Sequence, residues 1–275
     1  MRKLLTRTIT GIVLVLVMLA ALFVSEYSFA ALFLLILVGA SIEFSQFFAH
    51  SEVKPGKWSS AILSVLLFIS FFLTARQVVG FEILAIFPLL FLAVMAAEMY
   101  RKKEKPIENI AITLFSILYI ALPLALTNFL VFPSFQETIT YTPRLLVALF
   151  VIIWVHDSGA YLVGVSIGRH RLFERISPKK SWEGAIGGTL TAILAAWFIA
   201  KYIPEISLLH WIIISVLVVV FSTFGDLTES MFKRYFGIKD SGNILPGHGG
   251  ILDRFDSLLF AAPVLVAYLK LFIER

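Results

Sequence analysis

The stretch "PGHGGILDRFDSLLFAAPVLVAYLKLFI", from Pro246 to Ile273, places a histidine, a glycine pair and three charged residues directly before, and partly inside, a long apolar run. Apolar runs of about 20 residues predict helices that span a membrane. A charged side chain at membrane depth costs about 2.5–3.5 kcal/mol on insertion scales, so such residues usually have a function. The stretch therefore predicts a spanning helix with a polar site at its beginning.

The composition of the whole chain indicates that lipid, rather than water, is its natural solvent. Hydrophobic residues make up 59% of the 275 residues, charged residues make up 15%, and the mean hydropathy is +0.93. Soluble domains carry about 25% charged residues. Cysteine is absent, which excludes disulfides, thiolate nucleophiles and cysteine-ligated zinc.

Apolar runs long enough to cross a bilayer recur along the chain, and they predict an all-α polytopic membrane protein with about nine transmembrane helices. The runs lie near residues 8–25, 28–48, 58–75, 81–100, 107–130, 144–165, 184–203, 207–230 and 251–272. We expect the first run to stay as a helix rather than leave as a signal peptide, because it is long and shows no clean small-residue cleavage site. Residues 1–130 are expected to form a scaffold of about five spans, and residues 131–275 to carry the cytoplasmic loops and the catalytic site.

The lysines and arginines predict which side of the membrane each loop occupies. With a cytoplasmic N-terminus, 18 of the 23 basic residues fall in cytoplasmic segments, among them the loops 166–182 and 231–250. This asymmetry fits the positive-inside rule and predicts that the C-terminus lies on the opposite side. Basic loops that face anionic headgroups also explain the net charge of +5, so no nucleic-acid partner is expected. Four acids at span ends then share the cytoplasmic side: Asp157, Asp226, Asp253 and Asp256.

The helical spacing of polar residues in the last two spans predicts a site for a cation and for phosphate. In the eighth span a polar face is formed by Asp226, Glu229, Ser230 and Lys233, and in the ninth Asp253 and Asp256 are three residues apart. Gly249 and Gly250 would let a ligand approach the backbone and would offer free N–H groups at a helix start. Carboxylates from two helices suit Mg²⁺, and nearby bases suit phosphate: Lys233, Arg234, Lys239 and Arg254.

Each of these features also has a purely structural interpretation. Asp253 and Arg254 could complement a helix dipole and reach the interface, the glycine pair could be a hinge, and Lys179 and Lys180 could contact headgroups. Two further glutamates near span ends, Glu43 and Glu98, are expected to make structural hydrogen bonds. The convergence of acids, bases and glycines on one side of the membrane favours a cation-and-phosphate site. A cation-coupled transporter remains a second possibility on these grounds.

The stretch "SMFKRYFGIKDSGNILPGHGGILDRFD", residues 230–256, resembles the C-terminal motif of the bacterial phosphatidate cytidylyltransferases, the CDP-diacylglycerol synthases. Two shorter stretches are similar to the same family: "HDSGAY" at 156–161 and "SPKKSWEG" at 177–184. His156 departs from the family pattern, which often has a small or amide residue there. The long motif covers 27 residues and specifies about fifteen positions.

The resemblance implies transfer of the cytidylyl group of CTP to phosphatidic acid, giving CDP-diacylglycerol and pyrophosphate, at the cytoplasmic face of the cell (inner) membrane. It implies Mg²⁺ as cofactor, with room for a second cation, and a homodimer. The implied metal ligands are Asp226, Asp253, Asp256 and Asp157, and the first three also count as catalytic together with Lys233. The implied substrate-binding residues are Ser177, Lys179, Lys180, Arg234, Lys239, His248, Gly249, Gly250 and Arg254, with Ser177, Lys179 and Lys180 on a mobile phosphate-binding loop. The alternatives are an isoprenoid-lipid kinase or an archaeal-lipid cytidylyltransferase.

Overall fold

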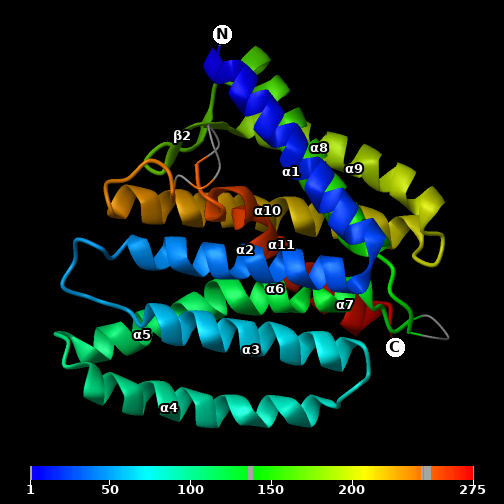
Figure 1. Cartoon of the computed structure of the whole chain (residues 1–275). Coiled ribbons are helices and arrows are strands. Elements are labelled where there is room, and N and C mark those ends of the chain that lie inside the picture. The colour runs from blue at the N-terminus through cyan, green and yellow to red at the C-terminus, as the bar shows by residue number, and fades with distance from the viewer. Residues whose placement is uncertain (1, 136–138, 243, 245–248, 275) are drawn as a thin grey trace. The chain divides into compact units, whose positions relative to one another are not determined.

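The structure is a computed structural model that describes residues 2–135, 139–242, 244 and 249–274, and it is built almost wholly from helices (Figure 1). The chain forms two compact units. The first consists of Met1–Tyr141 and Asp240–Arg254, and the second of Thr142–Lys239 and Phe255–Arg275. The boundary between the units therefore falls inside the last helix, which begins in the first unit.

Helices of the first unit follow one another as antiparallel neighbours, α2 beside α3 and α4 beside α5 (Figure 1). They are α1 (Arg2–Val24), α2 (Glu26–Gln46), α3 (Lys57–Ala75), η1 (Phe81–Ala85), α4 (Ile86–Arg101), α5 (Pro106–Ser116), η2 (Ile117–Ala121), α6 (Leu122–Leu126) and α7 (Asn128–Val131). The run from α5 to α7 corresponds to one predicted span. Its π-helical turn η2 ends at Ala121, two residues before Pro123, which has no N–H to donate to the carbonyl four residues earlier.

A single serine separates the first two spans. Ser25 has extended backbone angles, and its hydroxyl accepts a hydrogen bond from the N–H of Ser28 at 3.1 Å. The Ser28 hydroxyl lies 3.0 Å from the N–H of Ser25, which completes a capping box. The reciprocal pair satisfies two N–H groups at the start of α2, so the chain can reverse direction within the short stretch "SEYS".

Aromatic packing forms the core of the first unit. Phe29, Phe33 and Phe68 are fully buried, and the ring centroids of Phe29 and Phe33 lie 4.6 Å apart. Large apolar side chains are exposed elsewhere on the same helices, for example Leu16 on α1 and Leu89 on α4. Extensive exposed apolar surface is what a helix bundle presents to lipid.

The second unit contains three long helices, a hairpin and most of the last helix. Its elements are α8 (Arg144–Ile167), β1 (Arg171–Phe173), β2 (Ser177–Ser181), α9 (Trp182–Tyr202), α10 (Leu208–Tyr235) and α11 (Leu252–Phe272). Helices α8 and α9 pack against each other along their length, and α10 packs against both. Strands β1 and β2 pair antiparallel, with Arg171 opposite Ser181 and Phe173 opposite Ser177.

The predicted all-α polytopic membrane architecture is confirmed. Among the described residues, eight helices are long and apolar enough to span a membrane, and the apolar part of α1, Thr8–Val24, is shorter. Most helix boundaries lie within about two residues of the predicted spans, because they coincide with a change from apolar to polar sequence, whereas α1 begins earlier and α10 ends later, through polar residues. The hairpin is an addition that hydropathy did not predict. The segment Asp240–Arg254 belongs to the unit formed by the N-terminal helices, whereas the predicted division had placed it with residues 131–275.

Candidate active site

Charged side chains from four elements meet in the second unit. Lys180 on β2 forms an ion pair with Asp226 on α10. Asp157 on α8 interacts electrostatically with both of them. Asp256 on α11 interacts electrostatically with Asp226, Lys233 and Lys180. We call these five residues, Asp157, Lys180, Asp226, Lys233 and Asp256, the Asp226 cluster. They come from four separate elements of the chain, and all five were predicted to act on a cation or on phosphate.

A close contact between α10 and α11 places Asp226 beside Asp256. A Cβ atom at Gly225 would lie 2.4 Å from the carbonyl oxygen of Asp256 and 3.1 Å from the Cα atom of Ser257. Any larger residue at this position would push the two helices apart. Gly225 therefore permits the approach that brings the two aspartates into one cluster.

The hairpin positions Lys180 at the start of α9. The Ser181 hydroxyl caps this helix by accepting a hydrogen bond from the N–H of Gly184 at 3.2 Å. In the first turn, the Glu183 carboxylate accepts hydrogen bonds from the N–H groups of Arg169 at 3.1 Å and His170 at 3.2 Å. These contacts join both ends of the hairpin to the helix. The stretch that holds Ser177, Lys179 and Lys180 is thus a paired strand, not the loop that we expected.

One face of α10 carries polar groups as its spacing predicts. Lys233 forms an ion pair with Glu229, one turn earlier, and the Glu229 side chain is fully buried. Lys233 also interacts electrostatically with Asp256. The ion pair with the buried Glu229 thus tethers Lys233 to α10.

Asp253, the remaining predicted acid, lies in the first unit on the opening turn of α11. Its Oδ2 atom accepts hydrogen bonds from the N–H groups of Ser241 at 2.9 Å and Gly250 at 2.8 Å. The Ser241 hydroxyl accepts in turn from the N–H of Asp253 at 3.3 Å. The N–H of Gly250, which we had expected to be free for a ligand, therefore donates within the chain. Gly249 has a φ of +84°, a conformation that favours glycine.

The other predicted substrate-binding residues lie at the ends of these elements. Exposed side chains belong to Lys179 on β2, Arg234 near the end of α10, Lys239 after it and Arg254 in the first turn of α11, and Ser177 at the start of β2 is half-buried. His248 lies outside the described residues. The structure thus provides exposed basic groups in both units, close in sequence to the acids.

Glu43 makes structural hydrogen bonds, as the sequence predicted, but its partners lie far away in the sequence. This residue lies on α2, in the part expected to be scaffold, and its fully buried carboxylate contacts the motif segment of the first unit through Ser241, Ile251 and Leu252. An ionisable residue inside an apolar span is itself a signal of function. The sequence could not show which segment supplies its partners.

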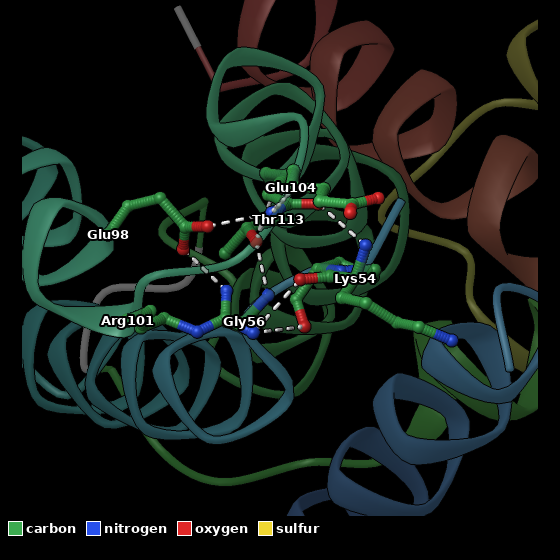
Figure 2. A network of polar contacts seen from close by, with 8 residues as sticks. Lys54, Gly56, Glu98, Arg101, Glu104 and Thr113 are labelled. Atoms are coloured by element: carbon green, nitrogen blue, oxygen red, sulfur yellow. Dashed lines mark hydrogen bonds and ion pairs between the residues drawn. The ribbon is translucent and has the colours of Figure 1, made fainter. Parts of the chain in front are cut away.

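The second buried glutamate of the first unit, Glu98, lies in a network without any predicted site residue (Figure 2). It forms an ion pair with Arg101 and accepts a hydrogen bond from the Asn109 side chain at 2.8 Å. The N–H of Lys54 donates to Asn109 Oδ1 at 2.6 Å. The network joins the beginning of α3, the end of α4 and α5. The structural role predicted for Glu98 is confirmed.

The donor groups of the Asp226 cluster fit a hard cation by their chemistry. In the parts of the chain that the structure describes, no group of three or more histidine, cysteine, aspartate or glutamate side chains is arranged as metal ligands. Asp157, Asp226 and Asp256 nevertheless offer oxygen donors only, which Mg²⁺ prefers. In this arrangement the Lys180 ammonium group neutralises Asp226, as a cation would.

Comparison with known proteins gives a family match over nearly the whole chain. The model of the cytidylyltransferase family matches residues 5–272. Among curated proteins, the chain is 46% identical over 136 residues to a phosphatidate cytidylyltransferase of Staphylococcus epidermidis, covering 49% of this chain and 52% of the relative. A protein of the same name from Haemophilus influenzae is 47% identical over 124 residues, or 43% of each chain. One from Staphylococcus aureus is 45% identical over 136 residues. The chain thus spans about half the length of the curated relatives that it matches.

Proposed function

The chain belongs to the cytidylyltransferase family, and on this premise we propose that it transfers the cytidylyl group of CTP to phosphatidic acid, giving CDP-diacylglycerol and pyrophosphate. The observation that carries the proposal is the Asp226 cluster, in which acids and lysines from four elements meet within a membrane protein. The names of the relatives support the choice of substrates.

The reaction needs positioning and charge neutralisation more than proton transfer. A phosphate oxygen of phosphatidic acid forms a new bond to the α-phosphorus of CTP, and the bond from that phosphorus to the bridging oxygen of the β-phosphate breaks. Pyrophosphate leaves with the electron pair. The attacking phosphate is already anionic, so no strong base is required, and the enzyme lowers the barrier by aligning the groups and stabilising charge.

The basic residues supply the phosphate contacts in this proposal. Lys180 and Lys233 lie inside the Asp226 cluster, where they can hold phosphate oxygens close to the carboxylates. Further contacts to the triphosphate or the lipid phosphate would come from Ser177, Lys179, Arg234, Lys239, His248, Gly249 and Arg254. Lysine acts as a compact charge and arginine as a bidentate donor, so the two residue types suit different phosphate groups.

The acids supply the cation site. We assign Asp226 and Asp253 as the first ligands of Mg²⁺, with Asp256 and Asp157 as further ligands, and the four carboxylates could accommodate a second cation. Asp253 and Asp256 are three residues apart in the sequence of α11. When bound, Mg²⁺ neutralises phosphate oxygens and assists the departure of pyrophosphate.

The setting of the reaction is part of the proposal. We place the protein in the cell (inner) membrane, with the N-terminus and the site facing the cytoplasm, the C-terminus on the opposite side, and a homodimer as the assembly. CTP would reach the site from the cytosol and phosphatidic acid from the lipid. The positive-inside distribution of lysine and arginine supports this orientation.

A transfer assay tests the function. Purified full-length protein in detergent is incubated with Mg²⁺, phosphatidic acid and CTP labelled at the α-phosphate, and lipid is then extracted. We expect the label in the lipid fraction. Transfer of a γ-phosphate label to a prenol would instead identify a lipid kinase, and an archaeal lipid as the only acceptor would identify the other cytidylyltransferase. Ion flux in liposomes without any transfer would identify a transporter.

Two variants of the second unit sharpen the assay. Asp226→Asn keeps the size of the side chain and removes its charge, and we expect turnover to fall by at least about 100-fold. Glu205→Gln breaks only the ion pair of Glu205 with Arg144, and we expect nearly normal turnover. Nearly normal turnover in Asp226→Asn would remove Asp226 from the site.

Single-cysteine labelling tests the orientation, and the absence of native cysteine makes it clean. We expect a cysteine in place of Asp240 to react only after the cytoplasmic side is opened. A cysteine in place of Glu205, in the turn between α9 and α10, should react from outside intact cells. The reverse pattern would overturn the proposed orientation.

A further inference from the structure

The buried carboxylate of Glu43 receives hydrogen bonds only from the motif segment of the first unit, as far as the described contacts extend. Its Oε1 atom accepts from the N–H of Ile251 at 2.9 Å, and its Oε2 atom accepts from the N–H of Leu252 at 2.9 Å and from the Ser241 hydroxyl at 3.1 Å. The donors lie 198 to 209 residues away in sequence. An acid of α2 thus binds both ends of the segment 241–252.

The position of Glu43 at the start of α11 accounts for its burial as a carboxylate. A buried charge is costly unless charged hydrogen bonds compensate for it. The N–H groups of Ile251 and Leu252 lie at a helix start and have no acceptor within the helix, and the helix dipole there also favours an anion. Ile251 itself has no side-chain acceptor that could cap the helix. Glu43 therefore acts as a cap supplied from another helix.

Two glycines leave room for the Glu43 carboxylate. A Cβ atom at Gly242 would lie 2.4 Å from Oε1, and a Cβ atom at Gly250 would lie 2.4 Å from Oε2. The carboxylate cannot move away freely because three donors hold it. The motif thus has glycine at two described positions that border the carboxylate, although Glu43 itself lies outside the motif.

Ser241 connects Glu43 to Asp253. The Ser241 hydroxyl donates to Glu43 and accepts from the N–H of Asp253, while the Ser241 N–H donates to Asp253 Oδ2. The position of the Glu43 carboxylate therefore determines where the Asp253 carboxylate is presented. This chain of contacts lies entirely within the first unit.

We propose that Glu43 is a positioning residue for the transfer reaction: it holds Ser241, Ile251 and Leu252 beside the start of α11 so that Asp253 is presented to the phosphate-bearing substrates. The catalytic part of this inference rests on the proposed function. Glu43 itself touches no reacting atom. Its contribution is the pre-organisation of groups that do, which lowers the barrier because those groups need not reorder during the reaction.

The variant Glu43→Gln tests the proposal because a glutamine offers one acceptor oxygen to three donors. The matched control is Glu98→Gln, which changes the other buried glutamate of the same unit in a network without site residues. Both variants are compared at a temperature where each is fully folded. Turnover per folded molecule is measured with saturating CTP and phosphatidic acid, and the KM for each substrate is measured separately. Hydrogen exchange is measured in peptides that cover residues 249–254.

We expect Glu43→Gln to lose at least about 30-fold in turnover at saturating substrate and to exchange faster at residues 249–254, with unchanged exchange in α8 and α9. We expect Glu98→Gln to stay within about twofold of wild type in turnover. Faster exchange with normal turnover would reduce Glu43 to a structural cap, and unchanged exchange would show that Glu43 does not hold the segment. Either result overturns the proposal.

A milder variant covers the case in which Glu43→Gln does not fold. Ser241→Ala removes one donor to Glu43 and the acceptor of the Asp253 N–H, and keeps only the backbone hydrogen bond from residue 241 to Asp253. We expect an intermediate loss of about 3- to 10-fold with faster exchange at the same peptides. Wild-type turnover and exchange in this variant would contradict the proposal. If wild-type protein transfers no cytidylyl group, the proposed function fails, and the exchange measurement still decides whether Glu43 holds the segment.

Discussion

Two buried glutamates of the first unit, Glu43 and Glu98, differ in the charge of their hydrogen-bond partners and in how far away these partners lie in the sequence. Glu98 is paired with the guanidinium group of Arg101, three residues later, and with the amide of Asn109, eleven residues later (Figure 2). Glu43 has only neutral donors among its described contacts, two backbone N–H groups and one hydroxyl, about two hundred residues away. Both side chains are nearly inaccessible, at 0% exposure for Glu43 and 5% for Glu98.

The comparison teaches that burial alone indicates only the free-energy cost of placing an acid in the interior. The partners of the acid indicate what the acid does in the structure. A local ion pair such as that of Glu98 with Arg101 stabilises the connection between two consecutive helices. Other residue pairs in the same place could do the same. A carboxylate that caps a distant helix start fixes one segment of the chain against another. The following four predictions test this contrast, from the largest expected effect to the smallest.

The largest effect is expected for Asp253→Asn, at the end of the contact chain from Glu43. One asparagine oxygen can still accept from the N–H groups of Ser241 and Gly250, so the local structure should persist. The lost charge should lower turnover by at least about 100-fold, because the charge would no longer complement a cation or align phosphate. Initial rates at several Mg²⁺ concentrations measure the effect. Turnover within about threefold of wild type would exclude Asp253 from the site.

A smaller loss is expected for Gly242→Ala, whose Cβ atom would collide with Glu43 Oε1. We expect turnover to fall about 10-fold, because the carboxylate must shift and release donors of the segment. The matched control is Gly56→Ala in the Glu98 network, where the nearest atom would lie 3.2 Å away. The control should keep normal turnover. Equal losses in both variants would erase the distinction between the two networks.

The variant Arg101→Lys should lower the stability of the protein and leave its turnover unchanged. The Arg101 guanidinium pairs with Glu98 and also donates to the carbonyl of Lys54 at 2.9 Å, and a lysine cannot reproduce this fork. We expect the free energy of unfolding to fall by about 1–2 kcal/mol, measured by denaturant titration in detergent. Turnover of the folded protein should remain unchanged. A turnover loss as large as that of Gly242→Ala would give the Glu98 network a role in catalysis.

The smallest effect is expected for Glu52→Gln, which breaks an exposed ion pair with Lys105 at the edge of the Glu98 network. The hydrogen bond from Lys105 holds the pKa of Glu52 below its usual value, and the same contact raises the pKa of Lys105. Any stabilisation from Glu52 is therefore present above the ordinary glutamate pKa and is lost as the pH falls through the lowered pKa. Because solvent screens both groups, we expect no measurable change in the thermal midpoint between pH 7 and pH 3 relative to wild type. A clear pH-dependent difference would show that this pair is not screened.

Much of the fold could be predicted because hydropathy is a local property. The spans near 58–75 and 144–165 appear as α3, Lys57–Ala75, and α8, Arg144–Ile167. The hairpin of β1 and β2 could not be predicted in this way, since its short polar strands carry no apolar run. Their pairing depends on contacts with the start of α9, made by Ser181 and Glu183.

The candidate site was predictable in its residue types but not in its contacts. The spacing of Asp226 and Lys233 correctly places them on one face of α10. Lys180 and Asp226 are 46 positions apart in the sequence, and their pairing depends on how β2 packs against α10. Glu43 carried a visible signal as an acid in an apolar run, yet no local pattern could identify its partners.

The sequence by itself determined that the chain crosses a membrane as a set of helices, and that its acids and bases gather near a few span ends. Both properties follow from solvation, because apolar runs enter lipid and charges stay at its edges whatever their neighbours. The tertiary structure alone decided that Lys180 meets Asp226 and that Glu43 caps α11. Such contacts depend on close packing between distant segments, which at Gly225 and Gly242 requires the absence of a side chain, and packing of that kind is a property of the folded chain.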